Sequence, residues 1–313
     1  MHNKIKELWN VELEKKFLNY TNATKFAVIS CTECNYSYQA FFRKKKPRYC
    51  PKCNGKLRSN TPQGRNAPVA NYTEQYAVDL INTVLSKRGY ENLEAKRDVI
   101  CEDLGLTSRS EADIAIVESG YPNKRREYSA ERIVIVFEVK MSIVFNWVPG
   151  PKLDSDYDGH KGRGSIYRTD SILKAIGKGT ILRSHYESHD IPYIVLGNCP
   201  PPSSYMKKIN GSKSIGIVQG FVSLNPNPLI VDKSNPKERD PKSSKNNGFI
   251  RMDSIQEFGD YIVDHLETER VFIGSMISKK KLGKLIKSIS LNNSYKEIGK
   301  EFFDKLHKKI KVK

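Results

Sequence analysis

The sequence predicts an α/β (α+β) protein in which helices flank a central mixed β-sheet. Between about residues 72 and 222, β-branched runs alternate with segments of helical period, which is the pattern of strands and helices packed in layers. The length of 313 residues exceeds that of most single domains. We therefore expect two further units beside the sheet: a small N-terminal unit that contains cysteine pairs, and a helical C-terminal segment.

Basic residues clearly outnumber acidic ones. The chain has 53 Lys and Arg against 35 Asp and Glu, a net charge of +18. This excess favours a polyanionic partner, with nucleic acid as the first candidate and a merely Lys-rich surface as the alternative. No apolar run approaches the roughly 18 residues of a membrane span, and the first residues lack the apolar stretch of a secretory signal. We expect a soluble, cytoplasmic protein with no membrane partner.

Four of the six cysteines form two C-x-x-C pairs with 15 residues between them, namely Cys31, Cys34, Cys50 and Cys53. This is the spacing of two zinc knuckles, and four thiolates complete the closed tetrahedron of a structural Zn²⁺ site. Asn54 and Gly55 follow the second pair, where the turn needs residues that tolerate a positive φ. A redox site would need one pair beside a βαβ unit, and disulfides are uncommon inside cells.

Basic residues crowd the segment between the two pairs. Those that we expect to contact DNA phosphates are Arg43, Lys44, Lys45, Lys46 and Arg48. The alternative is a solvated hairpin whose lysines only keep it soluble.

The first predicted elements after the cysteines are a linker, a helix and two strands. Prolines and turn residues predict a linker over 59–71. Thr73 is expected to cap a helix that Gly89 ends. The β-branched runs 113–117 and 132–140, separated by turn residues, predict a hairpin-like pair of strands.

The remaining elements complete the sheet. A polar loop is predicted over 149–168 and a helix over about 171–186, followed by strands at 191–196 and 215–222 and a flexible loop over 223–247. A basic helical face is one interpretation of three residues in the second helix, Lys174, Lys178 and Arg183.

The C-terminal segment is strongly basic. Ser294 and Glu297 form a capping box, and an apolar stripe follows at helical spacing. Residues 278–313 contain 12 Lys and 3 acidic residues, so they hold half of the net charge. A solvated helix face and a contact with the DNA backbone both remain open here.

Charged residues lie at the end of the second strand of the hairpin. Glu138 and Lys140 share one face of the strand because side chains repeat every two residues. Asp113 opens the first strand, so an antiparallel pairing would bring it close to both. Two carboxylates at one point form an oxygen site suited to Mg²⁺, and charges at the end of a buried strand are costly unless they are paired.

Asp113, followed after 24 residues by Glu138-Val139-Lys140, resembles the PD-(D/E)XK nuclease superfamily, and especially type II restriction endonucleases. The resemblance covers about residues 72–200 and includes the flanking helices. Ala112 stands where the motif usually has proline, and Glu111 shares the strand face of Asp113. We prefer Asp113 because it directly opens the apolar run.

The resemblance implies a restriction-endonuclease-like core and an Mg²⁺-dependent DNA endonuclease that leaves 5′-phosphate and 3′-hydroxyl ends. Asp113 and Glu138 would bind Mg²⁺, Lys140 would orient the attacking water, and Glu74 would support the metal site. Double-stranded DNA would be the substrate, a homodimer the assembly and a prokaryotic cytoplasm the location. Loop residues expected to contact DNA are Lys161, Arg163 and Arg168.

The predicted domains are therefore an N-terminal helix with a four-cysteine zinc ribbon over 1–60, the nuclease core with inserted loops over 72–275, and the basic helical segment over 276–313. Two alternatives stay open. One is a structure-specific or transposition-related nuclease with the same core, and the other is a non-catalytic zinc-ribbon DNA-binding protein.

Overall fold

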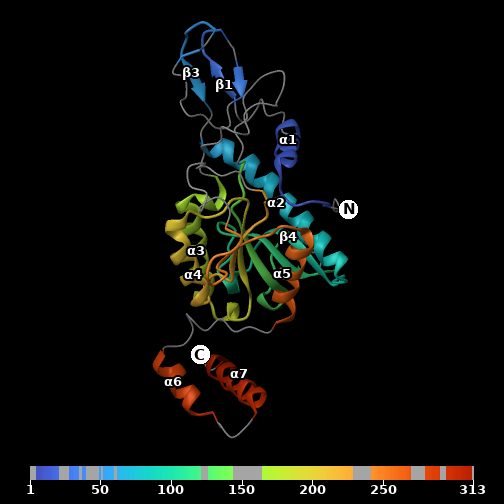
Figure 1. Ribbon diagram of the computed structural model, residues 1–313, viewed down its shortest axis with the longest axis vertical. Coiled ribbons are helices and arrows are strands. Elements are labelled where there is room, and N and C mark those ends of the chain that lie inside the picture. The colour runs from blue at the N-terminus through green and yellow to red at the C-terminus, as the bar shows by residue number, and fades with distance from the viewer. Residues whose placement is uncertain are drawn as a thin grey trace.

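The fold is described from a computed structural model of the chain (Figure 1). The described residues are 5–20, 28–34, 37–39, 49–50, 52–59, 62–120, 126–143, 164–227, 241–268, 279–289 and 294–311. The helices are α1 (Val11–Tyr20), α2 (Pro62–Lys87), α3 (Thr169–Ser184), α4 (Met206–Ser214), α5 (Ile255–Glu267), α6 (Lys279–Lys287) and α7 (Tyr295–Lys311). The strands are β1 (Val28–Cys31), β2 (Ser37–Gln39), β3 (Leu57–Ser59), β4 (Leu93–Val99), β5 (Ala112–Glu118), β6 (Ile133–Val139), β7 (Tyr193–Gly197), β8 (Gly220–Ser223) and β9 (Phe249–Arg251).

The central element is a six-stranded mixed sheet of order β4-β5-β6-β7-β8-β9. The pairs β4–β5 and β5–β6 are antiparallel, whereas β6–β7, β7–β8 and β8–β9 are parallel. Helices flank this sheet (Figure 1), and early in the sequence β1, β2 and β3 form a three-stranded sheet next to which four cysteines cluster. The α/β class with a central mixed sheet is thus confirmed.

Each face of the sheet has its own hydrophobic cluster. On one face, α2 and α5 contribute Leu80 and Phe258 to a cluster that also holds Ile114 of β5. On the other, α3 contributes Ile172 to a cluster with Ala115 of β5. The alternation of Ile114 and Ala115 follows from the two-residue period of a strand, and helices cover both faces (Figure 1).

The predicted hairpin is present, and its two strands are antiparallel. Ile114 pairs with Phe137 and Ala115 with Val136, and the register shifts by a bulge between Ile116 and Val117. The strand predicted over 191–196 corresponds to β7, which lies parallel to β6. The strand predicted over 215–222 is shorter than expected, because Gly216 (φ +76°) forms a turn ahead of β8.

The linker predicted over 59–71 is wrong for most of its length. Helix α2 begins at Pro62 and continues through Pro68. Proline is well tolerated in the first turn, and packing of Val69 and Tyr72 against the core favours the helix despite the interior Pro68. Thr73 lies inside the helix, where its hydroxyl donates to the Val69 carbonyl at 2.9 Å, and is not a cap.

The end of α2 agrees with the prediction, because Gly89 follows it with φ +80°. The edge strand β4 and helices α4 and α5 had no counterpart among the elements predicted from the sequence. Strand β4 has the sequence Leu-Glu-Ala-Lys-Arg-Asp-Val, so half-exposed polar residues hide its strand pattern.

Residues 5–17 pack against α2 and the core of the central sheet. Trp9 and Phe17 are fully buried in the core cluster. The Trp9 amide donates to the Leu224 carbonyl at 3.0 Å, and the Tyr76 hydroxyl donates to the Glu7 carbonyl at 3.2 Å. By these contacts, the core that was predicted from residue 72 onward includes the N-terminal segment.

Helices α6 and α7 contact each other through an apolar seam in which Leu285 and Leu306 are fully buried. The predicted capping box is present: the Glu297 amide donates to Ser294 Oγ at 3.4 Å, and Ser294 N donates to Glu297 Oε2 at 2.9 Å. Among the helices that the structure describes, none has the length and apolar content to cross a membrane.

Candidate active site and candidate metal centre

The hairpin β5–β6 brings the two predicted acids together. Asp113 and Glu138 lie one residue beyond the Ile114–Phe137 pair, where the two strands are neighbours. Asp113 Oδ2 accepts a hydrogen bond of 2.7 Å from the Val139 amide, which ties the carboxylate to the end of β6. Glu138 is only 5% exposed, so its charge must be balanced within the protein.

Lys140 completes the predicted triad. Its ammonium donates to Glu138 Oε1 and lies 3.6 Å from Asp113 Oδ2. Burial disfavours the charged lysine, but the attraction of Asp113 and Glu138 outweighs it and holds the pKa of Lys140 above its ordinary value. Asp113, Glu138 and Lys140 therefore form one interacting cluster, as expected for an antiparallel pairing of the two strands.

A second lysine, Lys178 of α3, joins the cluster and was not predicted as part of it. Lys178 Nζ donates to Glu138 Oε2 at 2.6 Å and to the Glu111 carbonyl at 2.6 Å, and it lies 3.6 Å from Asp113 Oδ1. The basic face expected for α3 is wrong in this respect, since Lys178 points into the cluster and Arg183 is 2% exposed. The helical period placed Lys178 on α3 but gave no sign of its partners.

The choice of Asp113 over Glu111 agrees with these contacts. The Asp113 carboxylate is the one that meets both lysines, and Glu111 offers its backbone carbonyl to Lys178.

Glu74 of α2 lies at the border of the cluster and is paired with Arg97 of β4. Arg97 Nη2 donates to Glu74 Oε2 at 2.5 Å. Burial raises the pKa of Glu74, and the charge of Asp113 adds to this rise, while Arg97 opposes it. The charge of Asp113 thus acts on the Glu74 carboxylate, whose hydrogen-bond partner is Arg97.

The donor set around Lys178 suits a hard cation. Carboxylate and carbonyl oxygens are the ligands that Mg²⁺ takes in proteins, and Lys178 Nζ is a cation that already contacts three of them, from Asp113, Glu138 and Glu111. Asp113 and Glu138 are the residues that could hold such an ion.

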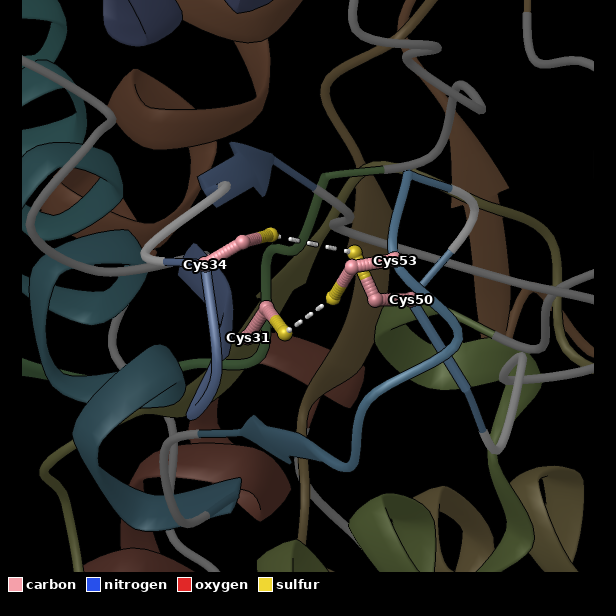
Figure 2. A group of neighbouring side chains, drawn as sticks. All are labelled: Cys31, Cys34, Cys50 and Cys53. Carbon is pink, nitrogen blue, oxygen red and sulfur yellow. Dashed lines mark hydrogen bonds between the residues drawn. The ribbon is translucent and has the colours of Figure 1, made fainter.

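The four predicted zinc ligands form a second site (Figure 2). Their sulfur atoms all lie within 4.8 Å of one another, with Cys31–Cys53 at 3.3 Å and Cys34–Cys50 at 3.7 Å. An ideal tetrahedron with Zn–S bonds of about 2.3 Å would separate the sulfur atoms by about 3.8 Å. The cluster could therefore hold a metal ion such as zinc.

Local hydrogen bonds shift the pKa values of Cys31 and Cys53 in opposite directions. Backbone amides of Glu33 and Gly55 donate to Cys31 and Cys53 at 3.3 and 3.4 Å. Although burial works in the other direction, backbone donors lower the pKa of Cys31 to about 7. The Gly55 amide acts to lower the pKa of Cys53, but hydrogen bonding with the neighbouring thiols, Cys31 foremost, raises it to about 12. Without a metal ion the cluster thus retains protons, and a cation would release them.

The turn after the second cysteine pair has the predicted conformation. Asn54 has φ +59°, in the left-handed region. Gly55 is needed for a different reason: a Cβ at this position would lie 2.3 Å from Cγ of Glu33. The second knuckle thus packs against the first through a glycine.

Most of the predicted DNA contacts fall outside the described residues, namely Arg43, Lys44, Lys45, Lys46, Arg48, Lys161 and Arg163. Arg168 precedes α3 and pairs with Asp170 through two hydrogen bonds of 3.1 and 2.8 Å. Its side chain is half exposed, so it is available at the surface next to α3.

Comparisons with protein-family models, with curated proteins and with solved structures found no match.

Proposed function

We propose that the protein is an Mg²⁺-dependent DNA endonuclease of the type II restriction kind, with a PD-(D/E)XK-like active site. The observation that carries this proposal is the convergence of Asp113, Glu138 and Lys140 at one end of the β5–β6 hairpin. Two acids and a lysine at this position are the minimum needed to hold a hard cation and to direct a water at phosphorus.

Each residue has a distinct role in the proposed reaction. Asp113 and Glu138 would hold Mg²⁺, which when bound supplies Lewis-acid stabilisation of negative charge. Lys140, next to Glu138, would orient the attacking water and offset charge on the phosphorane-like transition state. Attack of the water oxygen on phosphorus forms one P–O bond and breaks the bond to O3′, which takes up a proton. The products are a 5′-phosphate and a 3′-hydroxyl.

The charge of the chain supports a polyanionic substrate. The net charge is +18, and α6 and α7 belong to the segment 278–313, which holds half of it. The four-cysteine cluster is proposed here as a zinc ribbon, and its second half lies in the segment 43–58, which has eight Lys and Arg and no acidic residue. Double-stranded DNA is the proposed substrate and a homodimer the proposed assembly, since symmetric cutting of both strands calls for two sites.

One observation favours a non-catalytic alternative. Lys140 and Lys178 together balance the charges of Asp113 and Glu138, so the cluster also makes sense as a purely structural set of ion pairs. In that case the chain would be a DNA-binding protein with a zinc ribbon.

The deciding experiment is digestion of a mixture of plasmids with and without Mg²⁺. The wild type is expected to cut only with Mg²⁺, and Glu138→Gln and Lys140→Met are expected to lose at least about a hundredfold in rate while they still bind DNA. Glu131→Gln is the matched control, because Glu131 is exposed just before β6, at the end of the strand opposite the site.

The pattern of products separates the candidate functions. Discrete fragments support a restriction enzyme, and cutting confined to branched DNA supports a structure-specific nuclease. DNA binding without any cutting in Mg²⁺ or Mn²⁺ overturns the nuclease proposal and leaves the non-catalytic alternative.

A further inference from the structure

Lys178 reaches the carboxylate cluster because α3 packs closely against β7 of the sheet. Gly179 follows it, and a Cβ there would come within 2.8 Å of the Tyr193 ring of β7. The Tyr193 hydroxyl donates to the Ala175 carbonyl at 3.1 Å, one turn earlier in the helix. These contacts fix the rotation of α3 so that Lys178 faces Glu138.

The oxygens around Lys178 Nζ come from three separate residues. They are Glu138 Oε2 at 2.6 Å, the Glu111 carbonyl at 2.6 Å and Asp113 Oδ1 at 3.6 Å. An ammonium ion needs hydrogen-bond acceptors, and these are the same oxygens that a divalent cation would bind. The Lys178 side chain is 16% exposed, so the position is largely shielded from water.

Lys140 occupies the other side of the two carboxylates. It contacts Glu138 Oε1 and the Val139 carbonyl, and it lies nearest to Asp113 Oδ2. The two lysines thus divide the carboxylate oxygens between them. Lys140 directly follows the strand that carries Glu138, whereas Lys178 comes from a separate element, helix α3.

We propose that Lys178 is a built-in placeholder for the divalent cation: its ammonium occupies the cation position, and metal binding displaces it. This inference deepens the proposed function and rests on it. Without metal, the two ammonium groups balance the two carboxylates, and the buried Glu138 keeps a partner. A monovalent ion brings no more charge than the ammonium that it would replace, so the device selects for divalent ions.

The expected change in metal affinity follows from competition between the Lys178 ammonium and the metal ion. If the ammonium holds the position about 90–99% of the time, the apparent metal affinity is lowered by about tenfold to a hundredfold, because only the open fraction binds metal. Removal of the ammonium should therefore strengthen metal binding. A residue that merely supports the site would have the opposite effect, since its loss would leave the carboxylates misplaced.

The test is the affinity of the full-length protein for Mn²⁺, measured by electron paramagnetic resonance of the free ion. We expect Lys178→Met to bind Mn²⁺ about tenfold to a hundredfold more tightly than the wild type. Lys174→Met is the matched control, because Lys174 is exposed one turn earlier on α3 and its loss removes the same charge. The control should stay within about twofold of the wild type.

A second variant tests whether the result for Lys178→Met comes from the lost charge or from misfolding. Lys178→Gln retains a polar side chain of similar length without the charge, and it should show the same tightening. Equal or weaker Mn²⁺ binding by folded Lys178→Met and Lys178→Gln overturns the inference, as does equal tightening by Lys174→Met.

The two proposals fail in different ways. If the wild type cuts DNA with Mg²⁺ but the Lys178 variants gain no metal affinity, the placeholder is refuted and the nuclease stands. If the Lys178 variants bind Mn²⁺ more tightly and the wild type never cuts DNA, the placeholder stands and the nuclease is refuted. If no variant binds Mn²⁺, the placeholder is refuted as well.

Discussion

Lys178 of α3 donates a hydrogen bond of 2.6 Å to Glu138 Oε2 of β6, across 40 residues of sequence. Glu138 is the more deeply buried partner, with a side chain 7% exposed against 16% for Lys178. A buried carboxylate that lost this partner would depend on Lys140 alone. The bond therefore links the orientation of α3 to the charge balance of the candidate active site.

We expect strong energetic coupling between Glu138 and Lys178. In metal-free buffer, Glu138→Gln and Lys178→Met should each lower the free energy of unfolding. In the double variant the decrease should be smaller than the sum of the two single decreases by about 1–3 kcal/mol. Urea denaturation of the four proteins measures this cycle. Additive losses would mean that the hydrogen bond contributes little to stability.

The four-cysteine cluster should bind one zinc ion per chain. Cys31→Ser is expected to lose the zinc, because three thiolates leave one position of the tetrahedron without a sulfur ligand. The zinc affinity should then fall by several orders of magnitude. Cys101→Ala is the control, since Cys101 is buried beside β4, outside the cluster. Elemental analysis of both variants gives the result, and zinc retained by Cys31→Ser at the wild-type level would contradict the site.

Thiol reactivity should separate the two groups of cysteines. In the folded protein a chelator should expose four thiols to a disulfide reagent, while Cys101 and Cys199 stay protected. Cys101 and Cys199 belong to the hydrophobic core clusters on the two faces of the sheet, which a chelator does not open, so the reagent should not reach them. Counting released chromophore with and without denaturant checks this, and six fast thiols in the folded protein would be the contrary result.

Arg183 should be a strong structural anchor. Its guanidinium donates to the Gly216 carbonyl at 2.9 Å, to the Ile191 carbonyl at 2.8 Å, to Gln219 Oε1 at 2.7 Å and to the Ser188 carbonyl. Arg183→Met removes all four of these hydrogen bonds from a buried position and should cost about 3–5 kcal/mol. The exposed Arg168→Met is the control, expected within about 1 kcal/mol of the wild type in urea denaturation.

The start of α5 should make a small, acid-sensitive contribution. Arg251 Nε donates to Asp253 Oδ1 at 2.8 Å, and this bond, with help from Lys242, holds the pKa of Asp253 below its ordinary value of 3.8. Because the folded state binds the proton less well than the unfolded state, the stabilisation is present above about pH 4 and is lost as the pH falls through the folded pKa.

The variant Asp253→Asn isolates this contribution. Its stability deficit at pH 6 should be below about 1 kcal/mol, because the carboxylate is about half exposed, and the deficit should shrink at pH 3. Lys242 also contacts Glu257. The Asp253→Asn substitution leaves Glu257 unchanged, so its charge is the same in the variant and in the wild type. A deficit that is the same at both pH values would argue against the ion pair as its source.

The sequence by itself determined the features that depend on near neighbours. Glu138 and Lys140 share a strand face because of the two-residue period, and Asp113 joins them because a hairpin aligns its two strands. The cysteine spacing likewise predicted a cluster that the fold brings within 4.8 Å. In each case a short connection leaves few ways to arrange the residues.

The tertiary structure alone decided the rest. Lys178 enters the site only because α3 packs on the sheet through Gly179 and Tyr193, which lie in separate elements. Residues 5–17 join the core through Trp9 and Phe17, which no local pattern connects to α2. Long connections leave many arrangements open, and the burial of apolar side chains selects among them. In this fold, the packing of α3 on the sheet places Lys178 next to Glu138.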